Sequence, residues 1–454
     1  MIPVARRTRL RLGAVGVASL VAVGAFGLPG DSAGAAASRA RTVVDMPDEI
    51  SGPQVHFLYI VPADGADAQL DTNGQMEQSI ARIEHWLVTQ TQDQGLRIDT
   101  SGGAPDITFV RLPHSDAQAT ASNPSPNVVI GADLVAMGFN DPAKVYAAFY
   151  DGHGFSACGG ATSPALPKLG AMYLQAQPTN QSSPCRTPLS FGTGLGRPGF
   201  FEIALLHEIL HAIGFTPPCA PHRSADIWGD HVNDSRTDLM FGPDATIVGG
   251  WDWAHAVLDV NRDDYYRAHV PGCPDLSNSP YLAPLHPVSV TVSGPGTVTS
   301  SPEGIFCPDL CTWGFPRPVT LTATPSAGAV FKGWGGACSG TATCVLTSQG
   351  SASASFGASS HRRAVTLRVR AQRATGALRV VDGFDVCRVR APVVVERRGR
   401  NGWSIVRSAR TDRAGLFAVR VPRGRASYRA RAPETTASGA RCLETASRTV
   451  ATSG

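Results

Sequence analysis

His207, Glu208 and His211 are the residues whose types and spacing point most directly to chemistry. They form an H-E-x-x-H pattern, which places both imidazoles on one face of a helix with a carboxylate beside them. Imidazoles at this spacing are typical zinc ligands, and the carboxylate is placed to act as a general base. Because a catalytic zinc ion takes three protein ligands and leaves its fourth position to water, the pattern predicts a third ligand elsewhere in the chain.

The third ligand does not lie at the usual spacing. Gly214 follows His211 as in the longer signature H-E-x-x-H-x-x-G-x-x-H, but Pro217 occupies the position of the last histidine of that signature. The residues that follow leave four candidates open, namely His222, Asp226, Asp230 and His231.

The run HVNDSRTDLMF, residues 231–241, resembles the matrixin-like form of the metzincin signature. In that form the third histidine is followed by x-x-Asp and later by a Leu-Met-Tyr-like turn, as His231 is here followed by Asp234 and by the run DLMF. The resemblance implies that His231 is the third ligand and that Met240 forms the Met-turn under the metal. It also implies an insertion of about fourteen residues, which costs little because the entropy of loop closure grows slowly with length.

His222 remains the alternative third ligand. It lies soon after the helix, in the run CAPH, where Pro221 favours an extended approach. An aspartate ligand is known in the wider clan, which keeps Asp226 and Asp230 as further alternatives.

Residues 55–266 resemble a secreted actinobacterial zinc metalloprotease of metzincin type, through the runs HEILHAIGF, CAPH, HVNDSRTDLMF and LDVNRDDYY. The resemblance implies one catalytic Zn²⁺ and hydrolysis of peptide bonds, with Glu208 as the general base. One position departs from the family, because Gly242 stands where several metzincins have a tyrosine that steadies the oxyanion. Tyr265 and Tyr266 are candidates to replace that tyrosine, although such a pair is more often used for packing.

Helices and strands must position these residues. FFEIALLHEILHAI (200–213) is predicted to be the helix that carries the motif and to end at Gly214. GQMEQSIARIEHWLVTQT (74–91) has the period of an amphipathic helix, and VHFLYIVP (55–62) that of a buried strand. Further strands are expected in LRIDTSG, DITFVRL, KVYAAFY and GAMYLQA. This order predicts a mixed sheet with the motif helix packed beneath it.

Changes in composition predict four segments: a signal peptide at 1–40, a zinc metalloprotease-like catalytic domain at 41–287, a β module at 288–359 and an Arg-rich β-sandwich at 361–454. The predicted fold class is therefore a multidomain α+β protein, with a zincin-like mixed α/β domain followed by two small all-β modules. Residues 288–359 resemble the divergent bacterial β-repeat module, through VTSSPEGIFC, VTLTATP and FKGWGGAC. The last segment is similar to immunoglobulin-like or transthyretin-like sandwiches.

The N-terminal segment and the cysteines predict an exported protein. Four arginines precede the apolar run LGAVGVASLVAVGAFGL, and SAGAAASRA offers a signal-peptidase site. No other stretch approaches the roughly 20 apolar residues of a membrane span. We therefore expect a secreted monomer without a membrane anchor after signal cleavage, whose ten cysteines form disulfides. The expected pairs are Cys158–Cys185, Cys219–Cys273, Cys307–Cys311, Cys338–Cys344 and Cys387–Cys442.

Charge is distributed unevenly along the chain. Residues 361–454 hold 21 arginines and 6 acidic residues, whereas the rest of the chain holds 19 basic and 30 acidic residues. The arginines either decorate the solvent faces of strands or bind an anionic cell-wall polymer, and both interpretations stay open. Nucleic acid is not an expected partner, because an exported protein seldom meets it and no recognition motif is present.

Three classes of function are consistent with these patterns. The favoured one is a secreted zinc endopeptidase acting on protein or peptide substrates. The alternatives are a zinc hydrolase of cell-wall amide bonds and a surface-binding protein whose protease-like domain is inactive. The intact H-E-x-x-H pattern argues against the inactive protein, and the lack of a G-x-S-x-G elbow argues against a serine nucleophile.

The Arg-rich segment generates the first testable prediction. If it tethers the protein to anionic polymers, a chain ending at Ser359 should be released from isolated cell walls at low salt, while its turnover of a peptide substrate stays unchanged. Sedimentation of both forms with walls at low and high salt measures this. Equal retention of the two forms would indicate that the arginines only cover the solvent-facing sides of the strands.

Overall fold

The computed structural model describes residues 40–120, 126–154, 157–162, 167–176, 185, 190–224, 230–242 and 250–452. Within these ranges the protein is multidomain and mostly β: the strands form eight sheets, and buried apolar residues form three clusters, in 55–282, 288–356 and 365–432. The multidomain organisation agrees with the prediction, and among the described residues the α-helices are confined to the first of these regions, as expected of a chain that continues into β modules. The expected signal peptide lies outside the described residues except for its last position.

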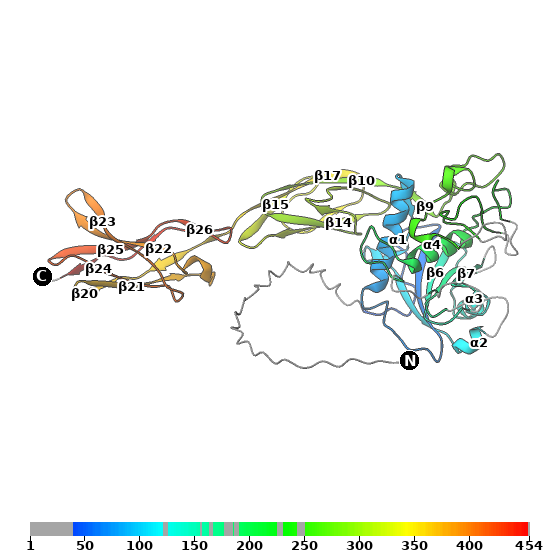
Figure 1. Cartoon of the computed structure of the whole chain (residues 1–454), viewed down its shortest axis with the longest axis horizontal. Helices are drawn as coiled ribbons and strands as arrows, with labels where there is room; N and C mark the ends of the chain where they lie inside the picture. Colours follow the sequence, from blue (N-terminus) through cyan, green and yellow to red (C-terminus); the bar gives the residue numbers. More distant parts are fainter. Residues whose placement is uncertain are drawn as a thin grey trace, which may run out of the picture. The chain divides into compact units, whose positions relative to one another are not determined.

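The first region is built on a five-stranded sheet with the order β5-β1-β6-β8-β7. Four strands are parallel, and β7 lies antiparallel to β8 at one edge. Every residue of β1 and β6 is buried, as expected of parallel strands covered on both faces. The strands are β1 (Gln54–Val61), β5 (Ile107–Arg111), β6 (Lys144–Tyr150), β7 (Gly159–Thr162) and β8 (Lys168–Tyr173) (Figure 1). Two small pairs join β2 (Gln94–Leu96) with β9 (Leu282–Pro284), and β3 (Thr100–Ser101) with β4 (Ala104–Pro105).

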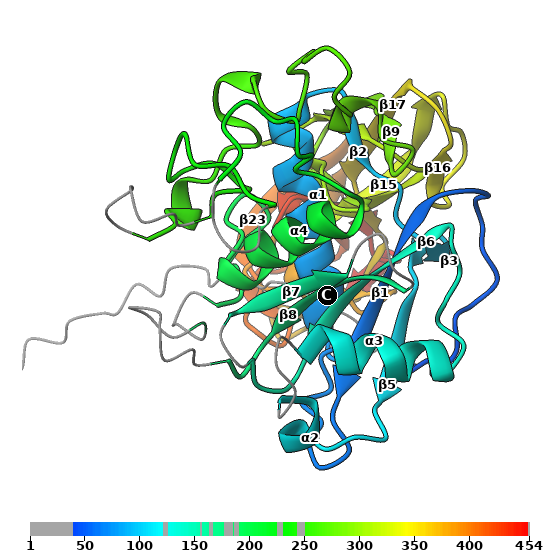
Figure 2. The ribbon, with the colours of Figure 1, turned by 90° about the vertical axis from the view of Figure 1, so that its right-hand side faces the viewer.

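Helices cover both faces of this sheet. α1 (Gln75–Thr91) and α4 (Phe200–Ala212) lie on one side of β7 and β8, and α3 (Pro126–Ala136) lies on the other (Figure 2). Right-handed crossovers explain this arrangement. The chain passes from β1 through α1 to β5 and returns through α3 to β6 on the far side of β1, so the two crossover helices must lie on opposite faces. A short helix, α2 (Asp116–Thr120), precedes α3.

Both predicted helices are present within one residue of their predicted bounds. Gly214 follows α4 with a φ of +89°, the left-handed conformation expected of a residue that ends a helix. The predicted strands other than LRIDTSG coincide with β1, β5, β6 and β8, whereas LRIDTSG contains only the last residue of β2 and the two residues of β3. α3 is not predicted by periodicity, because the apolar residues of PNVVIGADLVA fall on several faces and Val128 is exposed.

Glu202 fixes the start of α4 and joins it to α1. Its carboxylate accepts the backbone N–H groups of Gly192 and Gly199, which precede the helix. It also accepts hydrogen bonds from the Ser79 hydroxyl and the Arg82 guanidinium of α1. Because Glu202 is completely buried, pairing with Arg82 offsets the cost of removing its charge from water.

Two glycines allow α4 to lie directly on β7 and β8. A Cβ at Gly170 would lie 2.7 Å from the carbonyl carbon and oxygen of Glu208. A Cβ at Gly159 would lie 2.6 Å from Glu208 Oε1. A side chain at either position would therefore displace the helix or its carboxylate.

Residues 286–358 form two four-stranded sheets around the second apolar cluster, with the orders β13-β10-β17-β15 and β12-β11-β14-β16. Trp334 is buried there and donates its indole N–H to the carbonyl of Ala342, so it packs the core as a structural residue. The strands are β10 (His286–Ser293), β11 (Gly296–Ser301), β12 (Phe306–Cys307), β13 (Thr312–Phe315), β14 (Val319–Pro325), β15 (Ala329–Gly336), β16 (Cys344–Leu346) and β17 (Gly350–Ala358).

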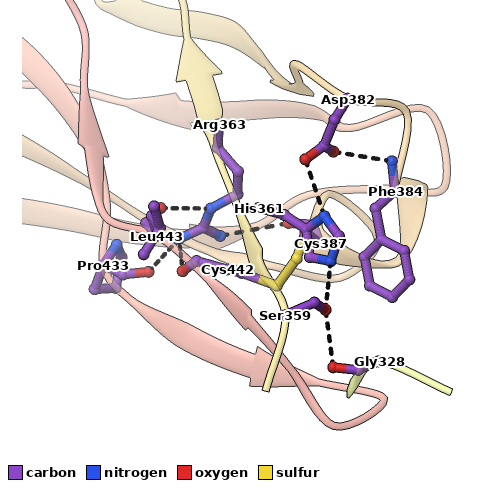
Figure 3. The surroundings of a disulfide bond; sticks show 10 residues. All are labelled: Gly328, Ser359, His361, Arg363, Asp382, Phe384, Cys387, Pro433, Cys442 and Leu443. Atoms are coloured by element: carbon purple, nitrogen blue, oxygen red, sulfur yellow. Dashed lines mark hydrogen bonds and ion pairs between the residues drawn. A yellow bond between two sulfur atoms is a disulfide. The ribbon is translucent and has the colours of Figure 1, made fainter. Parts of the chain in front are cut away.

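Residues 360–452 contain the remaining sheets. Arg363 is the only buried arginine among the described residues of this segment. Its guanidinium donates to the carbonyls of Leu443, Pro433, Cys442 and Cys387, beside the Cys387–Cys442 disulfide (Figure 3). The strands are β18 (Ser360–His361), β19 (Arg363–Val365), β20 (Arg368–Arg370), β21 (Arg373–Val380), β22 (Pro392–Gly399), β23 (Gly402–Arg410), β24 (Leu416–Arg420), β25 (Ala426–Ala432), β26 (Thr435–Ala437), β27 (Ala440–Cys442), β28 (Thr445–Ala446) and β29 (Val450–Thr452).

The structure contains five disulfides, which join the five pairs that the sequence predicts: Cys158–Cys185, Cys219–Cys273, Cys307–Cys311, Cys338–Cys344 and Cys387–Cys442. This number of disulfides is compatible with an extracellular protein. Among the helices within the described ranges, none combines the length and apolarity needed to cross a membrane.

The contact between α4 and β8 predicts the effect of adding one methyl group. Gly170→Ala should lower the free energy of unfolding by about 1–3 kcal/mol, the usual cost of overpacking. Gly131→Ala in α3 is the control, because its Cβ would meet Pro167 at an ordinary 3.5 Å and alanine favours a helix. Urea denaturation of both variants measures the difference. Equal midpoints would show that α4 is free to shift away from the sheet.

Candidate metal centre

α4 presents His207 and His211 on one face, one helical turn apart. Their Nε2 atoms are 3.0 Å apart, and the Nε2 atom of His231 lies 3.3 Å from each of them. The three nitrogens therefore converge on one point, although His231 is 20 residues beyond His211. Of the predicted alternatives that the structure describes, only His231 joins the pair on α4.

The segment that delivers His231 is held by short β-bridges. Val232 pairs with Arg223 on one side and with Phe241 on the other, which fixes the backbone directly after the histidine. The Cys219–Cys273 disulfide ties the start of this segment to a later loop. These contacts explain how His231 comes to lie beside α4, although the chain has left that helix 19 residues earlier, after Ala212.

A hydrogen bond orients the imidazole of His207. Its Nδ1–H donates to the carbonyl oxygen of Leu239 at 2.6 Å, so the tautomer leaves the lone pair of Nε2 directed at the other two histidines. The turn that carries Leu239 is held by Asp238, whose carboxylate accepts from the N–H of Met240 and from the hydroxyl of Tyr265. Met240 is completely buried in the core of this region.

Burial controls the charge of the site. It lowers the pKa of His207 to about 3, with a further contribution from the imidazole of His231, and it also lowers the pKa of His211. Burial raises the pKa of Glu208 to about 8. Neutral imidazoles offer lone pairs to a metal, and a cation held by them would favour the ionised form of Glu208.

Trp251 is a residue of this site that the motifs do not identify. Its ring centroid lies 5.3 Å from that of His207, and its indole N–H donates to the carbonyl of Asp238. Phe200 of α4 packs against the same indole, with ring centroids 6.2 Å apart. The run WDW, residues 251–253, was the available sequence signal, but no spacing linked it to the histidines.

The other candidates lie elsewhere. His222 bonds through its Nδ1 atom to the carboxylate of Asp264 at 3.1 Å. Asp230 is exposed, and Asp226 is outside the described residues. The hydroxyls of Tyr265 and Tyr266 bond to Asp238 and Gln94, which assigns both tyrosines a packing role.

The three histidines fit a zinc ion. Ligands about 2.0–2.1 Å from a tetrahedral ion lie about 3.3–3.4 Å from one another. The measured separations of 3.0–3.3 Å between Nε2 atoms are close to this edge length. The side-chain set of three neutral imidazoles, with an adjacent carboxylate that has no hydrogen-bond partner among the described residues, is thus compatible with a metal.

Comparisons with known proteins show only distant likenesses. No family model and no curated protein matches the chain. Among solved structures, wild-type OgpA from Akkermansia muciniphila is similar at 11% identity and a TM-score of 0.29, over 90% of this chain and 96% of that chain. A catalytically inactive OgpA, in complex with an O-glycopeptide substrate, gives 10% identity and a TM-score of 0.27 over 89% and 94%. The Bacillus anthracis TIE protein gives 10% and 0.15 over 36% and 35%. None of these likenesses is close enough to support an argument about function.

Because the three histidines converge, replacing His231 and replacing His222 should affect the zinc site of highest affinity differently. His231→Ala should weaken this site by more than the roughly 10–100-fold that loss of an outer-shell partner costs, because only two imidazoles remain. His222→Ala should leave the tightest site intact. Competition of the apo-protein with a chromophoric chelator for Zn²⁺ measures both affinities. Loss of the tightest site in His222→Ala, with His231→Ala unaffected, would reverse the assignment.

Proposed function

We propose that the protein is a secreted zinc-dependent endopeptidase with a zincin-like catalytic domain of metzincin type. The observation that supports this most strongly is the meeting of three imidazole nitrogens, two of them from the helix that also carries Glu208. His207, His211 and His231 would hold the ion. When bound, zinc supplies a Lewis acid that polarises the scissile carbonyl and acidifies water.

Glu208 is the proposed general base. It follows His207 directly in α4, and its carboxylate lies against Gly159 of the edge strand β7. Burial raises the pKa of Glu208 to about 8, and a cation at the histidines would lower it and favour the ionised form that accepts a proton. Glu208 would accept a proton from the attacking water at a carboxylate oxygen and deliver that proton to the leaving amine.

The edge strand β7 offers a way to orient a peptide. It is the last strand of the sheet, and its Gly159 lies directly against Glu208. An extended peptide can add to a sheet edge through main-chain hydrogen bonds, with little dependence on its side chains. A substrate aligned with β7 would bring a peptide bond close to Glu208, which favours an endopeptidase over a hydrolase of small amides.

Glu208→Gln separates metal binding from catalysis. The variant should keep close to one equivalent of zinc at the histidines but lose at least about 10²-fold in peptidase activity, because the amide cannot accept the proton. Glu303→Gln, an exposed glutamate in the second region, is the matched control. Digestion of unfolded casein, with and without a chelator, provides the activity.

The same assay tests the proposed substrate class. A wild-type protein that retains zinc but cleaves cell-wall amides and not casein would contradict the endopeptidase. Full activity of Glu208→Gln would remove the proposed role of the carboxylate.

A further inference from the structure

A second group of metal-binding side chains lies apart from the three histidines. It contains His222, Asp234, Asp263 and Asp264, with one ligand atom of each within 4.8 Å of every other. The first two residues come from the segment that delivers His231. The last two come from the run LDVNRDDYY, which the proposed catalytic chemistry does not use.

The backbone holds this group together from both sides. The N–H of Asn233 donates to the carbonyl of His222, which sets Asp234 beside the histidine. On the other side, the buried carboxylate of Asp259 accepts the N–H groups of Asp263 and Asp264. The side chains are therefore presented by two separately fixed loops.

The carboxylate of Asp234 has no hydrogen-bond partner among the described residues, and the imidazole of His222 is the only cationic group among the four side chains. Solvent reaches less than 1 Å² of either carboxylate oxygen, and neither oxygen accepts a hydrogen bond within the described structure. One carboxylate oxygen of Asp263 is likewise buried and accepts no hydrogen bond within the described structure. Leaving a buried carboxylate unpaired is costly, so these oxygens indicate a missing cation.

Within the described ranges, protein cations offset these carboxylates only through the imidazole of His222, which lies 3.1 Å from Asp264 and 3.8 Å from Asp263. No arginine or lysine in the described ranges forms an ion pair with Asp234, Asp263 or Asp264, and His222 pairs chiefly with Asp264. A comparable group elsewhere in the fold shows the contrast. Asp45 and Asp99, near His56, receive the ammonium of Lys144 at 2.7 and 2.8 Å, so that group carries its own cation.

We infer that His222, Asp234, Asp263 and Asp264 form a second site, which binds a divalent cation. Access is open, because the side chains of His222 and Asp263 are 41% and 42% exposed, whereas that of Asp264 is completely buried. One imidazole with three carboxylates suits a six-coordinate Mn²⁺ or a Zn²⁺ ion better than Ca²⁺, which prefers oxygen ligands alone.

The second site would act on the segment that carries His231. His222 and Asp234 lie on either side of His231 in the chain, and an ion bound to both would fix them to the 259–266 loop. Its proposed role is to position the segment, so the ion takes no part in the reaction. Because its ligands are distinct from the three histidines, binding at this site can be measured without reference to peptidase activity.

The test removes the histidine centre first. Full-length His211→Ala, stripped with a chelator and dialysed separately against Mn²⁺, Zn²⁺ and Ca²⁺, should still bind one equivalent of Mn²⁺ or Zn²⁺ by elemental analysis. Adding Asp234→Asn should abolish that binding. Asp252→Asn in the same background is the control, because the Asp252 side chain is 38% exposed and bonds, among the described residues, only to His255.

Thermal unfolding shows that the variants are folded. Without metal, Asp234→Asn should be no less stable than its parent, because it removes a carboxylate whose oxygens are buried and accept no hydrogen bond. With metal, only the parent should gain stability, since an ion that binds the folded state alone stabilises it. No bound ion in His211→Ala, or equal binding after Asp234→Asn, would overturn the second site. Binding of Ca²⁺ alone would overturn the assigned class of ion.

Discussion

Three imidazole nitrogens within 3.0–3.3 Å of one another form the constraint on which the first region depends. Lone pairs at this distance repel one another unless a cation lies between them, and burial disfavours protonation of His207 and His211. The fold must therefore hold the three rings in place before any ion arrives. Three contacts hold the rings in place. α4 packs closely on Gly170, the Leu239 carbonyl accepts a hydrogen bond from His207, and Val232 forms two β-bridges.

Local features of this arrangement could be predicted from the sequence. α4 and its two histidines follow from helical periodicity, and the left-handed Gly214 follows from the rule for helix ends. The buried strands β1 and β6 follow from continuous apolar runs. Each of the five disulfides joins two cysteines that have no other cysteine between them in the chain, so pairing consecutive cysteines was sufficient to predict them.

Features made by distant contacts could not be predicted in this way. His222 and His231 are both reachable after α4, and the choice depends on bridges from Val232 to Arg223 and Phe241. The place of Trp251 over His207 depends on a turn whose path has no local signature. The sequence predicted β modules after residue 285, but the order of the strands within their sheets depends on distant pairings and could not be predicted. The arginines of residues 361–454 are evident from the sequence as a net positive charge. The sequence does not show which carbonyl groups accept hydrogen bonds from a buried arginine such as Arg363.

The Cys219–Cys273 disulfide makes the candidate metal centre depend on the redox conditions around the protein. It closes the chain around the segment that delivers His231, and its two cysteines are 54 residues apart. In a reducing cytoplasm both would remain thiols, and the segment would lose a crosslink that limits its freedom. On the proposed function, the producing cell would hold a newly made chain with a weakened third ligand, and the enzyme would mature only after it reached oxidising conditions. The crosslink would thus act as a safeguard against self-digestion before export.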